Sequence, residues 1–129
     1  MGPFRARAVV VSTKYRQHIL EAEGYGEILR VLPFVVDSDE DRFSAAFLRM
    51  AVTAANGGTA GHLACRYQHV VAEDGAHHQH FVSDGDGKPL FRTEYMEIGS
   101  AANRRTREFL QRAVATLNGA APSRTGKGS

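Results

Sequence analysis

Two glycines, Gly24 and Gly26, interrupt a stretch that is otherwise rich in strand-forming residues, and they limit how residues 13–36 can fold. Inside one long helix over residues 13–32, each glycine would cost about 1 kcal/mol relative to alanine. A glycine inside a strand instead often marks a bulge or a bend in a barrel wall. We therefore predict a strand over about residues 25–36 that bends or begins at the glycines, with Pro33 at an edge or a bulge.

Several further segments have the composition or the alternation of strands. Residues 4–13 end in a β-branched cluster, and residues 61–72 alternate between apolar and polar side chains. The segments "HFVS" and "PLFRTEYMEI" flank the turn sequence "DGDGK", which predicts a hairpin. Residues 14–23 fit a helix or a strand, and the sequence leaves both open.

Residues 43–55 are the most ambiguous segment, because two periodicities fit them. A helix would have one apolar face between a cap and a stop: Phe43, Phe47, Met50, Ala51 and Ala54, after Ser38 or Asp39 and before Asn56-Gly57. A strand would place the alternate residues from Ala46 to Ala54 on one face, with Phe43, Phe47 and Arg49 on the other. We favour the strand because of the family resemblance described below.

The region after Ser100 predicts an amphipathic helix that ends near Gly119. We expect one domain over residues 1–119 and a flexible tail over residues 120–129, and we find no internal repeat. The predicted fold class is mainly β (α+β). It is either a small five-stranded OB-like barrel or a strongly curved antiparallel sheet, followed by the C-terminal helix.

Composition narrows the function classes. The single cysteine, Cys65, cannot form an intrachain disulfide, and the longest apolar runs are shorter than the roughly 20 residues that span a bilayer. No signal peptide is apparent, so we expect a cytoplasmic protein. The net charge of +2 combines basic ends with an acidic centre, a pattern typical of arms that touch polyanions or of a surface that favours solubility.

No catalytic motif appears in the chain, so we expect a non-catalytic protein without a cofactor. Five of its six histidines fall between residues 62 and 80. Within this cluster His77, His78 and His80 are weak metal-ligand candidates, and the alternative is a solvated polar loop.

A strand at residues 43–53 would place aromatic rings beside arginines on one sheet face. Proteins that bind single-stranded nucleic acid use such faces, since bases stack on the rings while the cations pair with phosphates. The alternative is that the phenylalanines are core residues. The candidate nucleic-acid-binding residues are Tyr25, Arg30, Phe43, Phe47, Arg49, Arg66, Lys88, Phe91, Arg92 and Tyr95.

Two segments within residues 24–72 carry a family resemblance. "GYGEILRV" and "FLRMAVTAANG", followed by "HLACRYQHVV", resemble in order and spacing a family of replication-associated proteins of bacterial integrative conjugative elements. That family is similar to single-stranded DNA-binding proteins. The pattern does not extend beyond residue 75.

The resemblance implies an OB-like fold that binds single-stranded DNA during replication or transfer of a mobile element, often as a homo-oligomer. An alternative is a protein–protein interaction module, such as an inhibitor or an assembly subunit. A lesser alternative is a small histidine-dependent barrel that binds a metal or a ligand.

Overall fold

The computed structural model describes residues 2–119, so the predicted tail at 120–129 lies outside the described residues. The first half contains β1 (Phe4–Val10), β2 (Tyr15–Ala22), β3 (Gly26–Arg30), β4 (Phe34–Val35) and α1 (Asp39–Ala55). The second half contains β5 (Arg66–Val71), β6 (His77–Ser83), β7 (Phe91–Arg92), β8 (Met96–Glu97) and α2 (Ala101–Leu117).

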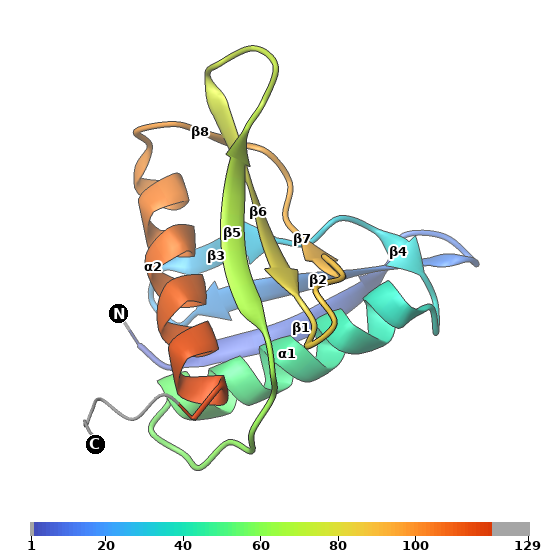
Figure 1. Cartoon of the computed structure of the whole chain (residues 1–129), viewed down its shortest axis with the longest axis vertical. Coiled ribbons are helices and arrows are strands. Elements are labelled where there is room, and N and C mark those ends of the chain that lie inside the picture. The colour runs from blue at the N-terminus through green and yellow to red at the C-terminus, as the bar shows by residue number, and fades with distance from the viewer. Residues whose placement is uncertain (1, 120–129) are drawn as a thin grey trace.

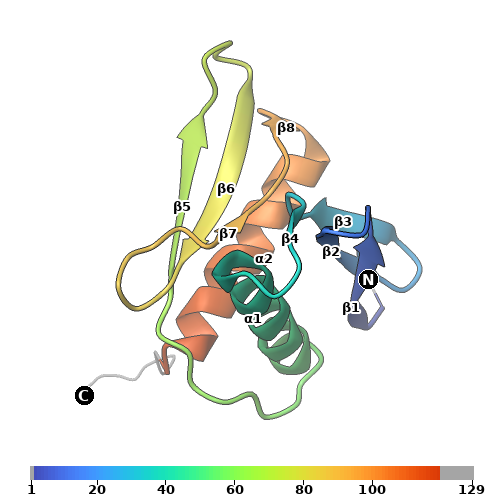
Figure 2. The same cartoon turned by 90° about the vertical axis from the view of Figure 1, so that its right-hand side faces the viewer.

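The strands form two four-stranded antiparallel sheets. In the first sheet, β2 pairs along its length with β1, while β3 and β4 share its other edge. In the second sheet, β6 pairs with β5 in the same way, while β7 and β8 share its other edge. Figure 1 shows the β5–β6 hairpin projecting beyond the rest of the molecule, and Figure 2 shows the two sheets on either side of the helices.

The two halves are structural repeats of each other. Each contains a hairpin, a third strand, a short fourth strand and a 17-residue helix, in that order. Residues 17–57 align with residues 79–119 without a gap, at a constant offset of 62. The identical pairs are Gln17/Gln79, His18/His80, Arg30/Arg92, Ser38/Ser100, Arg42/Arg104, Phe47/Phe109, Leu48/Leu110, Ala51/Ala113, Val52/Val114, Asn56/Asn118 and Gly57/Gly119. Our expectation that the chain has no internal repeat is therefore wrong.

The first strands of the repeats align at an offset of 61, because the β5–β6 loop is one residue longer than the β1–β2 loop. The strand registers confirm this offset, since Ala6 lies opposite Leu20 and Tyr67 lies opposite Val82. Leu20 and Val82 are themselves equivalent. Ala6 therefore corresponds to Tyr67, and Ala8 corresponds to His69.

The sheets meet at a bridge between two equivalent residues, Val31 and Thr93. On either side of the bridge, Leu32 N–H donates to the Arg92 carbonyl and Glu94 N–H donates to the Arg30 carbonyl. Leu32 is equivalent to Glu94, and Arg30 is equivalent to Arg92, so superposing one repeat on the other turns each of these hydrogen bonds into the other. An approximate two-fold axis therefore passes through the bridge. The side-chain amides of Gln17 and Gln79 extend the symmetry by donating to the Val31 and Thr93 carbonyls, at 2.8 and 3.0 Å.

Both helices begin in the same way. The Ser38 hydroxyl accepts the Asp41 N–H at 3.2 Å, and the Ser100 hydroxyl accepts the Asn103 N–H at 3.1 Å. The residue before each cap has a positive φ, +66° at Asp37 and +88° at Gly99. The helices pack on each other, on their own sheets and on a strand of the other sheet (α1 on β7, α2 on β3). The core between them includes Leu20, Leu29, Phe47, Leu48, Val82, Phe91, Leu110 and Leu117.

The fold is β-rich with two antiparallel sheets and the predicted C-terminal helix, but no closed barrel forms within residues 2–119. The five-stranded count is wrong, because the described chain has eight strands. Residues 43–55 belong to α1, so the strand prediction there is also wrong; the Ser38 cap and the apolar helical face determined the outcome. Gly24 lies in the turn between β2 and β3 and Gly26 begins β3, and both have positive φ.

The asparagine that ends each helix binds the first strand of its repeat. Asn56 accepts from Phe4 N–H at 2.7 Å and donates to the Phe4 carbonyl at 2.9 Å. Asn118 makes the same pair with Cys65, at 3.0 and 2.6 Å. Each side chain therefore fixes where a strand enters its sheet.

We predict that Asn56→Ala and Asn118→Ala each lower the free energy of unfolding by about 1–2 kcal/mol, because the first removes two and the second three side-chain hydrogen bonds to the backbone. Urea denaturation measures the effect. Thr116→Ala, at an exposed position near the end of α2, is the control and should change stability by less than about 0.5 kcal/mol. If the control changed stability as much as the asparagine variants, the asparagine side chains would not be what fixes the strands.

Candidate binding groove

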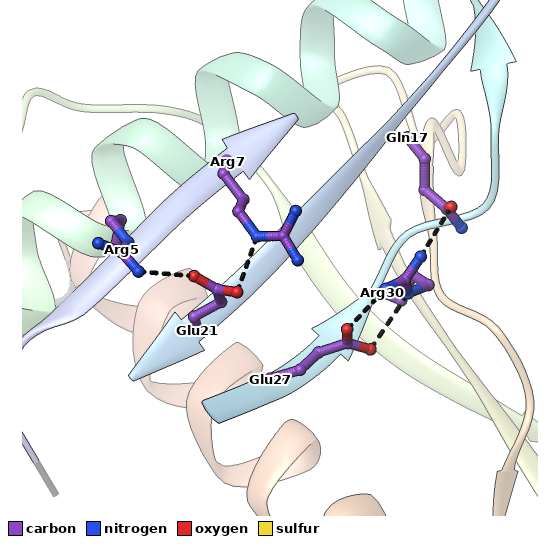
Figure 3. A network of polar contacts seen from close by, with 6 residues as sticks. All are labelled: Arg5, Arg7, Gln17, Glu21, Glu27 and Arg30. Carbon is purple, nitrogen blue, oxygen red and sulfur yellow. Dashed lines mark hydrogen bonds and ion pairs between the residues drawn. The ribbon is translucent and has the colours of Figure 1, made fainter. Parts of the chain in front are cut away.

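The outer face of the first sheet carries a polar network that largely neutralises its own charge (Figure 3). Glu21 accepts from Arg5 at 3.0 Å and from Arg7 at 2.7 Å, and these hydrogen bonds lower the pKa of its carboxyl group. Glu27 pairs with Arg30 at 2.7 Å and raises the pKa of that guanidinium group. The cations on this face are thus engaged by carboxylates.

The predicted nucleic-acid platform does not assemble. Phe47 and Phe91 are fully buried and meet edge to face, 5.1 Å apart, and Phe43 stacks on Phe47. The prediction that these rings face solvent is wrong, because the helical period of α1 turns Phe43 and Phe47 inward and β7 places Phe91 in the same core. Tyr25 and Tyr95 remain exposed.

The predicted cations also lie on separate elements. Arg30 pairs with Glu27, and Arg92 lies over the Phe34 ring at 5.3 Å. Arg66 begins β5, Lys88 lies in the turn before β7, and Arg49 is exposed on α1. Tyr25 is covered on one face by the Arg105 guanidinium group, 4.2 Å from the ring centre. Of the ten candidates, only Arg49 lines the groove described next.

The histidine cluster packs as an aromatic group. The His80 ring bonds through Nδ1 to the Tyr67 hydroxyl and through Nε2 to Asn103, both at 2.7 Å. His78 accepts from Asn103, and His77 bonds to Asp74. Within residues 2–119, no group of three or more histidine, cysteine or acidic residues could hold a metal ion.

A groove of about 580 Å³ lies between β1 and α1 in the first repeat. Small side chains form much of it, since Ala6 and Ala8 come from β1 and Ala45 comes from α1. Leu48 and Val52 add apolar surface, and Arg16, Arg49 and His18 add polar groups. Alternation along β1 directs Ala6 and Ala8 away from Arg5 and Arg7, which also line the groove and pair with Glu21.

His18 is the most constrained polar group in the groove, with a side chain that is only 7% exposed. Its Nε2 lies 2.7 Å from Oδ1 of Asp41, and Oδ2 of the same carboxylate accepts from Arg16 at 3.2 Å and from Asp37 N–H at 2.8 Å. Burial alone would raise the pKa of Asp41, but the bonds from Asp37 and His18 and the charge of Arg16 together lower it. An ionised carboxylate only accepts, so Nε2 of His18 carries the proton, and Nδ1 is the acceptor in the tautomer that this bond selects.

The second repeat shows what the first one lacks. Where the groove has Ala6, Ala8 and Ala45, the second repeat has Tyr67, His69 and Arg107. Tyr67 donates to Nδ1 of His80, whereas Nδ1 of His18 has no hydrogen-bond partner in the described part of the chain. The same site is therefore filled by the protein in one repeat and open in the other.

Two residues near the central histidine differ between the repeats, and the change at one position matches the change at the other. Arg16 and Asp41 in the first repeat correspond to His78 and Asn103 in the second. Asp41 and Asn103 each accept the Nε2–H of the central histidine, and Arg16 and His78 each bond to that acceptor's side chain. The first repeat thus combines an open site with an ionised carboxylate.

Sequence reasoning missed both His18 and the groove. The available signal was the repeated Gln-His pair, at residues 17–18 and 79–80, together with the Asn-Gly pairs that follow the two helices. Aligned on those pairs, Ala6 and Ala8 stand opposite Tyr67 and His69, and the difference becomes visible.

The fold and the groove define a duplicated α+β protein in which one repeat has an open polar–apolar site. No family model, curated protein or solved structure matches the chain. No helix within residues 2–119 has the length and hydropathy that crossing a membrane requires.

We predict that acidification destabilises the protein through His80. Burial lowers its pKa from 6.5 to about 4, despite the opposing bond to Asn103, so between these values the unfolded chain binds a proton that the folded chain does not. Stability should be full above about pH 6.5 and should fall by up to about 3 kcal/mol as the pH drops to 4. Urea denaturation across this range measures the loss.

The control for this prediction is His80→Gln, which keeps a side-chain donor for Asn103 but does not titrate. This variant should be less stable at pH 7 and should lose most of the pH dependence between 6.5 and 4. An NMR titration that places the His80 pKa near 6.5 in the wild type would contradict the prediction.

We also predict coupling between Arg16 and Asp41. Asp41→Asn leaves the guanidinium group without its carboxylate and should cost about 1–3 kcal/mol of stability at pH 7. Adding Arg16→His reproduces the His78–Asn103 pair and should restore at least half of that loss. A double-mutant cycle by urea denaturation measures the coupling, and additive effects of the two changes would count against it.

Proposed function

We propose that the protein binds a small organic molecule in the groove between β1 and α1. The observation that carries the proposal is the contrast between the repeats. In the second repeat Tyr67 bonds to the central histidine, with His69 and Arg107 near it, whereas the first repeat has Ala6, Ala8 and Ala45 at these positions beside an open groove.

The volume and chemistry of the groove support this proposal. Its volume of about 580 Å³ falls within the range of small-molecule sites, which combine apolar walls with a few placed polar groups. Nδ1 of His18 supplies one such group, because it belongs to a side chain only 7% exposed whose orientation Asp41 fixes. Arg49 supplies a cation at the edge.

The residues that line the groove favour binding over covalent chemistry. None of the described lining residues is a serine or a cysteine, and the hydroxyl of Thr53 donates to the Arg49 carbonyl. The thiol of Cys65 lies in the core, where burial raises its pKa to about 11, so it is a poor nucleophile at neutral pH.

The test is an NMR screen of the full chain against a fragment library of neutral, acidic and basic aromatic and aliphatic compounds. We predict that hits shift the amides of Ala6, Ala8, Ala45 and His18. Ala6→Tyr, which supplies the ring that the second repeat carries at this position, should weaken those hits at least tenfold.

Ala115→Tyr is the matched control, because it adds the same ring at an exposed position on α2 outside the groove. It should leave the hits unchanged. A screen in which no fragment shifts the groove residues, or in which Ala6→Tyr binds as well as the wild type, would reject the proposed function.

Single-stranded DNA binding, and with it kinship to the conjugative-element family, stays a prediction. The buried rings of Phe47 and Phe91 remove its original basis, while Tyr95, Arg66 and Lys88 remain exposed on separate elements. Fluorescence anisotropy with a labelled oligonucleotide at low and moderate salt tests it. Affinity that falls steeply with salt would support it.

A further inference from the structure

We infer that the ligand of the groove is a small phenolic acid: an aromatic ring with a hydroxyl group that donates to His18 and an acidic group that pairs with Arg49. This inference rests on the proposed function and specifies its ligand class. It comes from treating Tyr67 as an internal template for what the first repeat binds.

The template is defined by the contacts of Tyr67. Its hydroxyl lies 2.7 Å from Nδ1 of His80, and its ring lies nearly parallel to the His80 ring, at 23° and 5.9 Å between centroids. Burial raises the pKa of Tyr67 to about 12, with a smaller opposing effect from Arg107, so the hydroxyl stays a donor across the physiological range. The second repeat therefore holds a phenol against its central histidine.

The first repeat presents the same histidine without the phenol. His18 and His80 are equivalent, and each directs Nε2 to the third residue of a helix, Asp41 or Asn103. Nδ1 of His18 is left as an acceptor on the side where Ala6 replaces Tyr67. A ligand that completes this site must bring a hydrogen-bond donor on a flat ring, and a phenol does both.

The position of the cations indicates the acidic group. The second repeat places Arg107 near Tyr67 and His80, whereas the first has Ala45 there and carries its cation at Arg49, where the second has Gln111. Arg5 and Arg7 pair with Glu21, and Arg16 pairs with Asp41. The side chain of Arg49 makes no ion pair or hydrogen bond with any residue from 2 to 119, so it can take an anion.

The experiment compares four probes by calorimetry on the full chain: 4-hydroxyphenylacetate, 4-methoxyphenylacetate, phenylacetate and the neutral 4-hydroxyphenylethanol. We expect the first to bind at least tenfold more tightly than each of the others, because it alone combines the donor with the acid. On ¹⁵N-histidine-labelled protein, it should shift the His18 Nδ1 resonance, and the methoxy analogue should not.

One variant and its control test whether Arg49 binds the acidic group of the ligand. Arg49→Gln, which installs the residue of the second repeat, should remove the preference for the acid over the neutral phenol. Gln111→Ala, on the exposed face of α2, is its control and should leave that preference intact.

The outcomes separate the ligand class from the proposed function. Suppose that fragments bind the groove and that Ala6→Tyr weakens their binding, but the methoxy analogue or phenylacetate binds as tightly as the phenolic acid. The phenolic-acid inference is then wrong, and the proposal that the groove binds a small molecule remains. If a tyrosine-containing peptide binds at least tenfold more tightly than the acid, the partner is a protein and the inference is overturned. If nothing shifts the groove, both proposals fail.

Discussion

The contact between Val31 and Thr93 is the constraint on which the arrangement of the two halves depends. Each repeat has its own sheet and helix, and the strands of the two sheets pair only at this bridge within the described chain. The bridge pairs two equivalent residues, so it acts on both repeats alike and brings α1 against α2. Gln17 and Gln79 bind the carbonyls of the bridging residues from the adjacent strands, which ties the joint to the centre of both sheets.

The two repeats resemble each other more closely at the Val31–Thr93 bridge than on their surfaces. Some buried positions keep their residue type, as in Leu48/Leu110 and Ala51/Ala113, while others exchange one buried residue for another, as in Leu29/Phe91. Positions on β1 and β5 are less constrained, and there Tyr67 occupies the position equivalent to Ala6. The repeats therefore keep the same order of strands and helix while they differ in the residues around the central histidine.

The sequence predicted those elements whose local signals agree with one another. The C-terminal helix has a serine cap, an apolar face and Gly119 after its end, and "DGDGK" connects β6 and β7 as a hairpin turn should. The prediction for residues 43–55 was wrong because the apolar residues of this alanine-rich helix fit the two-residue repeat of a strand as well as the 3.6-residue repeat of a helix. The cap at Ser38, which binds the amide three residues on, was the deciding signal. The groove could not be predicted, because alanines on a strand become informative only against the large residues that replace them in the other repeat.

The charge difference between the repeats explains why the open site belongs to the first. In the second repeat, the neutral Asn103 orients His80 only because His78 fixes the amide, and Tyr67 then completes the ring's second bond. Burial lowers the pKa of His80 to about 4, so that repeat keeps a neutral, closed cluster. In the first repeat, the ionised Asp41 fixes the proton on Nε2 of His18 through charge, with Arg16 and the Asp37 amide holding the carboxylate. Orientation of His18 thus needs no ring from β1, and its second nitrogen is positioned before any ligand arrives, which lowers the cost of binding.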